Sequence, residues 1–305
     1  MSQLPCEPPI EDLSPPEEAV ETVITPQPRD LGGFEVRRVL PSIVRRAVGP
    51  FVFLDQMGPA TFDAGKGVDV RPHPHIGLAT VTYLLKGSIL HRDSLGTVQA
   101  ITPGAVNLMT SGRGIVHSER TAPEVRQHSH PLFGLQLWVA LPRSSEEADP
   151  AFAHYAAAAI PQGDDANARV RVVAGEAFGL RSPVESAAPM FFFDIALAPG
   201  GAISLPANYA ERALYLIEGQ VAVGGASHAP GQMLVLAPGR EAVVRALEPA
   251  RLVALGGEPL DGPRHLWWNF VSSSKDRIEQ AKEDWRRNRF GLPVPQEHEF
   301  IPLPG

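Results

Sequence analysis

The stretch His73-Pro74-His75-Ile76-Gly77-Leu78-Ala79-Thr80-Val81-Thr82-Tyr83-Leu84-Leu85-Lys86-Gly87 decides the fold of this chain. Its centre is rich in β-branched and aromatic residues and it closes on Lys86-Gly87, which together predict a β-strand followed by a turn. Pro74 cannot donate a hydrogen bond to a neighbouring strand, so it predicts a strand edge, a strand start or a bulge. Similar short runs recur between 31 prolines and 28 glycines, a pattern typical of a mostly β protein.

Side chains that bind metals begin this stretch and recur further along the chain. The first cluster is His73-Pro74-His75 and the second is His117-Ser118-Glu119. The second follows a flexible turn at 110–114 and the apolar pair Ile115-Val116, so we expect it on a strand as well. Residues two apart on a strand share a face. If the two strands are neighbours, three imidazoles and one carboxylate converge, which is the set that a mononuclear metal centre needs.

The composition sets outer bounds on fold and function. The 305 residues are 44% hydrophobic and 20% charged, enough for one large core or two ordinary ones, and we expect two. A net charge of -7 and a pI near 5.8 argue against direct binding of nucleic acid. Cys6 is the only cysteine, so no intramolecular disulfide can form. Neither a signal segment nor an apolar run long enough for a bilayer is present, so we expect a cytoplasmic protein without a membrane partner.

The two ends of the chain differ from its middle. Residues 1–28 hold seven prolines and six acidic residues without Lys or Arg, which predicts an N-terminal arm. In residues 272–305, Ser273-x-x-Asp276 fits a helix cap, and Ile278, Ala281 and Trp285 repeat at helical spacing. We therefore expect an amphipathic C-terminal helix and tail to close the fold.

The middle of the chain contains an internal repeat. Tyr83-Leu84-Leu85-Lys86-Gly87 aligns with Tyr215-Leu216-Ile217-Glu218-Gly219, and Pro103-Gly104 aligns with Pro230-Gly231. The repeat is longer than that of a solenoid and predicts a duplicated domain, at 29–150 and 151–271.

The repeat also predicts that only its first copy holds a site. The first offset places Leu205 and Ala207 opposite the two histidines of the first cluster. The second places Val244 and Ala246 opposite His117 and Glu119. A shared scaffold explains strands in both copies, but it does not explain why every donor is apolar in the second copy.

These residues carry a resemblance to the pirin family. The similar segments are Arg71–Gly77, Thr80–Leu85, Pro103-Gly104, Ser111–Glu119 and Gly134–Val139, with Trp268–Ser274 running into Trp285 near the end. The resemblance implies a bicupin, an all-β fold of two cupin-type barrels packed face to face. It implies a metal-binding N-terminal barrel and a degenerate C-terminal one. The implied ligands are His73, His75, His117 and Glu119.

Other polar residues are interpreted as structural. His91, beside Arg92 and Asp93, is typical of a polar cluster at a strand edge, without partners at ligand spacing. His128-Ser129-His130 predicts a solvated loop. Ala79 stands where better-known pirins carry a glutamate, a departure that bears on the surroundings of the metal and on the substrate pocket.

The donor types predict the chemistry of the site. Three imidazoles and a carboxylate accept Fe(II), Mn(II), Co(II), Ni(II), Cu(II) or Zn(II), so affinity alone does not select one mononuclear divalent ion. The resemblance points to Fe(II). Four protein ligands on an octahedral ion leave two positions open, enough for a chelating substrate or for a substrate and dioxygen. Structural zinc sites are usually closed and rich in cysteine, so open positions favour catalysis.

The resemblance implies an oxygen-dependent oxidoreductase, a dioxygenase that opens the ring of a flavonol such as quercetin. Its partners would be a small aromatic substrate and dioxygen. Glu119 would be a ligand and also a base for the substrate hydroxyl, and Phe51, Phe53, Met109 and Trp138 are candidates for an aromatic pocket. The alternative is a non-enzymatic, redox-responsive metalloprotein that acts on a protein partner as a transcriptional co-regulator. A third hypothesis is an enzyme whose natural substrate is not a flavonol.

Overall fold

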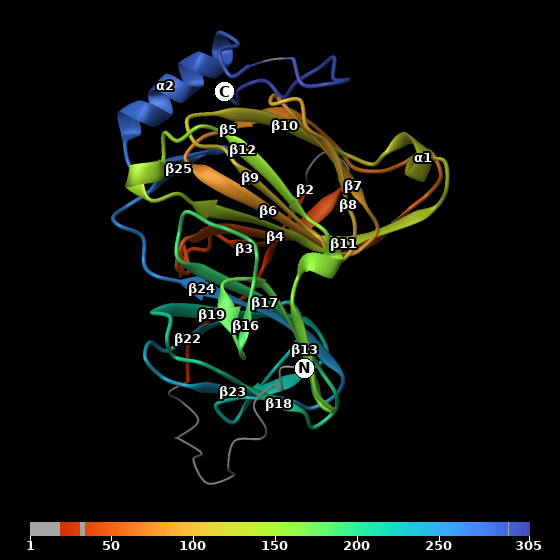
Figure 1. The fold of residues 1–305 in the computed structure, drawn as a ribbon, viewed down its shortest axis with the longest axis vertical. Helices are drawn as coiled ribbons and strands as arrows, with labels where there is room; N and C mark the ends of the chain where they lie inside the picture. Colours follow the sequence, from red (N-terminus) through yellow and green to blue (C-terminus); the bar gives the residue numbers. More distant parts are fainter. Residues whose placement is uncertain (1–18, 31–33, 292) are drawn as a thin grey trace. The chain divides into compact units, whose positions relative to one another are not determined.

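The computed structural model describes residues 19–30, 34–291 and 293–305, and residues 1–18 of the predicted arm lie outside it. The chain divides into two compact units, each built on a seven-stranded and a four-stranded sheet (Figure 1). The predicted all-β fold of two cupin-type barrels with a C-terminal helix is confirmed. No helix among the described residues is both long and apolar enough to span a membrane.

The first barrel comprises the described residues of 28–38, 53–157 and 260–305. Its larger sheet has the order β12-β9-β6-β11-β4-β3-β2 and its smaller sheet the order β5-β10-β7-β8. The bounds are β2 Gln27–Asp30, β3 Glu35–Leu40, β4 Phe51–Phe62, β5 Asp69–His75, β6 Leu78–Lys86, β7 Ile89–Asp93, β8 Val98–Ile101, β9 Val106–Thr110, β10 Ile115–Arg120, α1 Pro123–Arg126, β11 His130–Ala140, η2 Arg143–Ser145, β12 Ala151–Tyr155, β25 His265–Trp267, β26 Phe270–Ser272 and α2 Lys275–Arg286.

The second barrel comprises residues 39–52 and 158–259 with the described N-terminal residues up to Gln27. Its sheets have the orders β1-β22-β19-β24-β17-β14-β13 and β18-β23-β20-β21. The bounds are β1 Val20–Ile24, η3 Ala157–Ala159, β13 Gln162–Asp164, β14 Ala168–Ala174, β15 Glu176–Ala177, β16 Leu180–Arg181, β17 Met190–Leu197, β18 Ala202–Leu205, β19 Glu211–Glu218, β20 Val221–Val223, β21 Ala226–His228, β22 Met233–Leu236, β23 Ala242–Ala246 and β24 Ala250–Gly257.

The last part of the predicted arm is a strand. Val20–Ile24 forms β1 and pairs antiparallel with β22, at the edge of the larger sheet of the second barrel. The β-branched residues of Val20-Glu-Thr-Val-Ile24 favour this conformation. Proline and acidic content alone therefore did not show where the arm ends.

The C-terminal helix packs on the first barrel as its pattern predicts. Ile278, Ala281 and Trp285 of α2 are buried in a cluster with Val116 of β10. The helix begins one residue later than the predicted cap, because Ser274 accepts the hydrogen bond from the N–H of Arg277. The hydroxyl of Ser273 is engaged elsewhere, since it donates to buried Glu146 at 2.8 Å.

The strand pairing confirms the internal repeat and corrects one of its offsets. His117 pairs with His73, and Val244 pairs with Ile203. Ile203 and Leu205 are therefore the counterparts of His73 and His75, and the predicted pair Leu205 and Ala207 is wrong by two residues. The segment from Leu205 to Tyr215 is two residues longer than the segment from His75 to Tyr83, which caused the shift. The replacements are still apolar.

Candidate metal centre

The two donor clusters lie on neighbouring antiparallel strands. His73 and His75 stand on β5, His117 stands on β10, and His73 faces His117 directly across the ladder. β5 is an edge strand of its sheet, which is one of the places that Pro74 predicts. One nitrogen from each of the three buried imidazoles lies within 4.8 Å of the other two. The structure thus brings together the three predicted histidines.

Backbone carbonyls fix the orientation of two of these rings. Nδ1 of His73 lies 2.8 Å from the carbonyl oxygen of Arg71, and Nδ1 of His75 lies 3.0 Å from that of Asn269. A carbonyl oxygen only accepts hydrogen bonds, so in each neutral ring Nδ1 carries the proton and Nε2 keeps its lone pair. Nε2 of each ring is therefore available as a donor to a metal.

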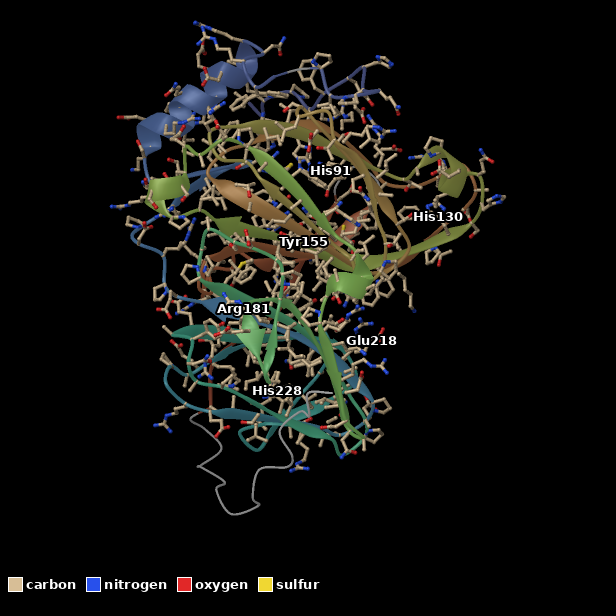
Figure 2. All side chains as sticks on the ribbon, viewed as in Figure 1. His91, His130, Tyr155, Arg181, Glu218 and His228 are labelled. Carbon is tan, nitrogen blue, oxygen red and sulfur yellow. The ribbon has the colours of Figure 1, made fainter. Side chains whose placement is uncertain are left out.

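His91 and Asp93 complete the surroundings of the His117 ring. The prediction of a polar cluster at a strand edge, separate from the three histidines, is wrong. His91 is buried rather than at an edge, with Nδ1 3.4 Å from Nδ1 of His117 and Nε2 3.0 Å from Oδ2 of Asp93. Its ring stacks on Phe152 with centroids 4.5 Å apart. Figure 2 shows His91 among the strands of this barrel. The signal was present, because His91 and Asp93 are two apart on a strand, like the two donor clusters.

Neutral His117 has one ring proton, which cannot form hydrogen bonds with both His75 and His91. Because the Asp93 carboxylate takes the proton of a neutral His91 ring on Nε2, that ring presents a lone pair to Nδ1 of His117. On the other side, Nε2 of His117 lies 3.1 Å from the bare Nε2 of His75. Whichever nitrogen of neutral His117 holds the proton, the other one faces a lone pair. A cation between the Nε2 atoms resolves this conflict, and two nitrogens bound at a right angle at about 2.1 Å lie about 3 Å apart.

The electrostatics keep the imidazoles in the form that binds metals. Burial lowers the pKa of His73 to about 4, an effect that its hydrogen bond with the backbone of Arg71 partly opposes. Burial first, and then the neighbouring imidazoles, hold the pKa values of His75 and His117 well below the usual range. All three rings are therefore neutral at physiological pH, as ligands must be.

Glu119 lies on the inner face of β10, two residues after His117, and is partly exposed. Its carboxylate is not in the group of donor atoms within 4.8 Å of one another. Burial of the carboxyl raises the pKa of Glu119 to about 7, an effect that a hydrogen bond with Thr82 opposes. The Thr82 hydroxyl also lies 2.9 Å from Oε1 of Gln136, so its single proton is shared between two acceptors. Glu119 as a fourth ligand remains a prediction.

Aromatic side chains form walls beside the three histidines. The rings of Phe53 and Trp138 stack with centroids 4.0 Å apart, and Trp138 meets His75 edge to face at 5.1 Å. Met109 lies opposite Phe152 in the ladder between β9 and β12. Phe51 belongs to the second unit. Ala79 alternates with Thr80 and Thr82 along β6, so it points to the opposite face of that strand.

The C-terminal tail, at residues 297–301, forms hydrogen bonds with the two strands that carry the histidines, β5 and β10. Glu297 accepts hydrogen bonds from the hydroxyl of Ser118 at 2.8 Å and from Arg120 at 2.8 and 2.6 Å. The N–H of Ile301 donates to the carbonyl oxygen of Pro72, next to His73. The tail therefore holds the backbone on both sides of the histidine pair His73 and His117.

The sequence matches two described families along its length. Residues 33–139 match Pirin, and residues 192–291 match the Pirin C-terminal cupin domain. A pirin-like protein of Caulobacter vibrioides is 51% identical over 93% of this chain and 99% of its own length. A Pseudomonas aeruginosa protein provisionally named quercetin 2,3-dioxygenase is 40% identical over 85% of this chain and 82% of its own. The crystal structure of quercetin 2,3-dioxygenase from Acinetobacter baumannii superposes with a TM-score of 0.86 at 34% identity, covering 93% of this chain and 95% of that one.

Proposed function

The chain belongs to the pirin family, and from that premise we propose that its first barrel holds one divalent transition ion and opens the ring of a flavonol with dioxygen. The observation that carries the proposal is the set of three neutral, converging imidazoles, whose contacts with one another and with a neutral His91 no arrangement of protons satisfies. In this proposal His73, His75 and His117 are ligands through Nε2, and Glu119 turns toward the same ion as the fourth.

Fe(II) is the proposed ion, and when bound it supplies a Lewis acid and a redox-active centre. The protein supplies the rest. Trp138, whose ring stacks on Phe53 and meets His75 edge to face, supplies an aromatic surface against which a flat aromatic substrate packs well. In the metal-free protein burial raises the pKa of Glu119 to about 7, so the carboxyl group can lose or accept a proton near neutral pH, as the proposed roles of ligand and base require. Thr82 holds that carboxyl by a hydrogen bond.

The names of two similar proteins support the substrate class. Quercetin 2,3-dioxygenase is the name of the Acinetobacter baumannii structure and the provisional name of the Pseudomonas aeruginosa relative. In a dioxygenase reaction of this kind the flavonol supplies all the electrons, and both oxygen atoms enter the product. The reaction therefore needs no further reductant.

Oxygen uptake with quercetin in a sealed cell tests the proposal directly. We expect uptake by the wild-type protein with Fe(II), little without it, and none by His117→Ala. His130→Ala is the matched control, because His130 is a buried histidine of the same barrel outside the three-histidine group. It should retain uptake. Equal rates for the wild type and His117→Ala would end the proposal.

Two other outcomes point to the alternatives. Elemental analysis of protein purified without added metal identifies the bound ion. If the ion loads but quercetin is inert, a substrate screen tests other aromatic substrates. Redox-dependent binding of a protein partner without oxygen uptake would favour the co-regulator role.

A further inference from the structure

His91 and Asp93 form a buried pair directly behind His117. Both lie on β7, next to β10, and their exposed fractions are 4% and 0%. The contacts run in a line from Asp93 Oδ2 to His91 Nε2 at 3.0 Å, and from His91 Nδ1 to His117 Nδ1 at 3.4 Å. Stacking on Phe152 holds the His91 ring in the plane that this line requires.

The Asp93 carboxylate is itself fixed by the backbone. Its Oδ1 accepts hydrogen bonds from the N–H groups of Leu95 and Thr97, at 2.9 and 3.1 Å. Only Oδ2 is left to face His91. Since an ionised carboxylate only accepts, the His91 proton must sit on Nε2, and its Nδ1 then accepts from Nδ1–H of His117. The Asp93 carboxylate thus favours the tautomer in which Nε2 of His117 carries the lone pair, against Nε2 of His75, which lies 3.1 Å from that nitrogen and competes for the proton until a cation takes its place.

The second barrel gives independent support. His91 faces Glu119 across the ladder as Val221 faces Ala246, and Asp93 faces His117 as Val223 faces Val244. The counterparts of His91 and Asp93 are therefore Val221 and Val223, and both are buried in the hydrocarbon core of that barrel. The second barrel has equivalent strands, but it lacks both the three histidines and the pair formed by His91 and Asp93.

We propose that Asp93 and His91 are positioning residues that select the His117 tautomer able to bind the metal through Nε2. The inference rests on the proposed metal centre and names the residues that prepare it. Hydrogen-bond partners of metal-binding histidines commonly change metal affinity by about 10- to 100-fold. Here the partner of the ligand is a second histidine, which Asp93 orients.

Asp93→Asn is the sharpest test because it keeps the shape and reverses the proton pattern. The Leu95 and Thr97 N–H groups retain the amide oxygen, so the amide NH₂ faces His91. His91 then accepts at Nε2 and donates from Nδ1, which forces the proton of His117 onto Nε2. We expect Co(II) affinity to fall about 100-fold. His91→Phe keeps the aromatic stacking and removes the acceptor for the Nδ1 proton of His117 without placing a donor there, so we expect a smaller fall of about tenfold.

A purely structural role predicts the opposite order, since His91→Phe removes a whole hydrogen-bonding side chain and Asp93→Asn changes one atom. Asp194→Asn is the matched control, because Asp194 is a buried aspartate of the second barrel. It should leave Co(II) affinity unchanged. If Asp93→Asn does not fold, the comparison of His91→Phe with the wild type still tests the proposal.

Nitrogen-15 NMR of metal-free, histidine-labelled protein gives a readout that is independent of metal binding. We expect a larger share of the His117 proton on Nδ1 in the wild type than in Asp93→Asn, where both neighbours of His117 favour a proton on Nε2. Failure of the wild type to bind Co(II) would overturn the metal centre but not this tautomer assignment. An unchanged His117 tautomer in Asp93→Asn, or undiminished Co(II) affinity in both variants, would overturn the positioning role of Asp93 and His91.

Discussion

The inner faces of the two barrels share a backbone pattern and differ in chemistry. Seven positions that pair in the same way across the ladders of both barrels are polar in the first barrel and apolar in the second. The pairs are His73 and Ile203, His75 and Leu205, His117 and Val244, Glu119 and Ala246, Thr82 and Leu214, Asn107 and Leu234, and Gln136 and Ala254. All seven residues of the second barrel lie in its buried core.

This difference shows that the barrel fold forms with either polar or apolar side chains at these inner positions. Backbone pairing holds the strands in both barrels, so it does not require polar side chains inside. Burying them is costly unless they are hydrogen-bonded, and the first barrel keeps an unpartnered Nδ2 on buried Asn107 besides the conflict at His117. The second barrel fills the same space with hydrocarbon. The polar interior therefore does not serve stability, which supports the proposed site.

Exchanging one residue between the barrels gives the largest expected effect. Val244→His places an imidazole without a partner in the dry core, and we expect it to destabilise the second barrel by about 4 kcal/mol. The reverse change, His117→Val, should leave the metal-free first barrel about as stable as before, because the hydrogen bond that it removes is offset by relief of the lone-pair contact on the other side of the ring.

Urea unfolding separates the two effects. All four tryptophans, at 138, 267, 268 and 285, belong to the first unit, so tryptophan fluorescence follows that barrel while far-UV circular dichroism follows both. A loss of stability in His117→Val as large as that in Val244→His would show that the imidazole is an ordinary core residue.

Removing the metal should destabilise only the first barrel. Protein loaded with Co(II) at about 1,000 times the dissociation constant gains about 4 kcal/mol. Adding a chelator should therefore lower the urea midpoint seen by tryptophan fluorescence and leave the second barrel unchanged. His117→Ala should show no chelator effect. Equal shifts in both barrels, or in both proteins, would contradict a single site in the first barrel.

The sequence predicted the barrels and the three histidines because their signals are local. Strand propensity, turns and the spacing of two residues on one strand need no knowledge of the third dimension. The repeat also predicted the dry second barrel. Its first offset was wrong at Ile203 and Leu205, since a segment that is two residues longer leaves no mark in the aligned strands.

Residues whose roles depend on distant partners were not predictable in the same way. His91 could be understood only once β7 lay beside β10, because its neighbour His117 is 26 positions away. Ser274 replaced Ser273 as the helix cap because Glu146, far away in the sequence, takes the Ser273 hydroxyl. Such cross-strand contacts follow from the fold and do not show in the local pattern.

The outer faces of β10 and of its counterpart β23 provide a smaller test of the comparison between the two barrels. In the first barrel, Ser118 is fully buried and hydrogen-bonded to Glu297, whereas the outward residues Val243 and Arg245 of the second barrel are exposed. Glu297→Gln should destabilise the first barrel by about 2 kcal/mol, since it weakens charge-assisted bonds to Arg120. Tryptophan-detected urea unfolding measures this loss.

The effect of Glu297→Gln should depend on pH. Burial raises the pKa of Glu297, but hydrogen bonds from Arg120 and Ser118 outweigh it and leave the pKa below the usual range. The carboxylate therefore stabilises the fold above the ordinary pKa of a glutamate, and this is lost as the pH falls through its lowered value. Glu299→Gln is the control, because Glu299 is 52% exposed and should contribute less than about 0.5 kcal/mol. Equal losses in the two variants would contradict a buried brace.

The smallest expected effect concerns Glu119, whose counterpart Ala246 has nothing to titrate. If Glu119 is the fourth ligand, its proton must leave when the metal binds. Its pKa of about 7 in the metal-free protein means that Co(II) affinity should fall about tenfold, or about 1.4 kcal/mol, for each pH unit below 7 and level off above it. The pKa of His73 is about 4, so the imidazoles do not cause this slope between pH 5.5 and 8.5.

Isothermal titration of Co(II) across that pH range, in wild type and in Glu119→Gln, measures the slope and its origin. The variant should bind more weakly at pH 8 and show an affinity that hardly changes with pH, because the amide has no proton to lose. A wild-type affinity that is flat between pH 5.5 and 8.5 would mean that Glu119 stays outside the coordination sphere. The first barrel would then hold its ion through three histidines, and Glu119 would act on the substrate alone.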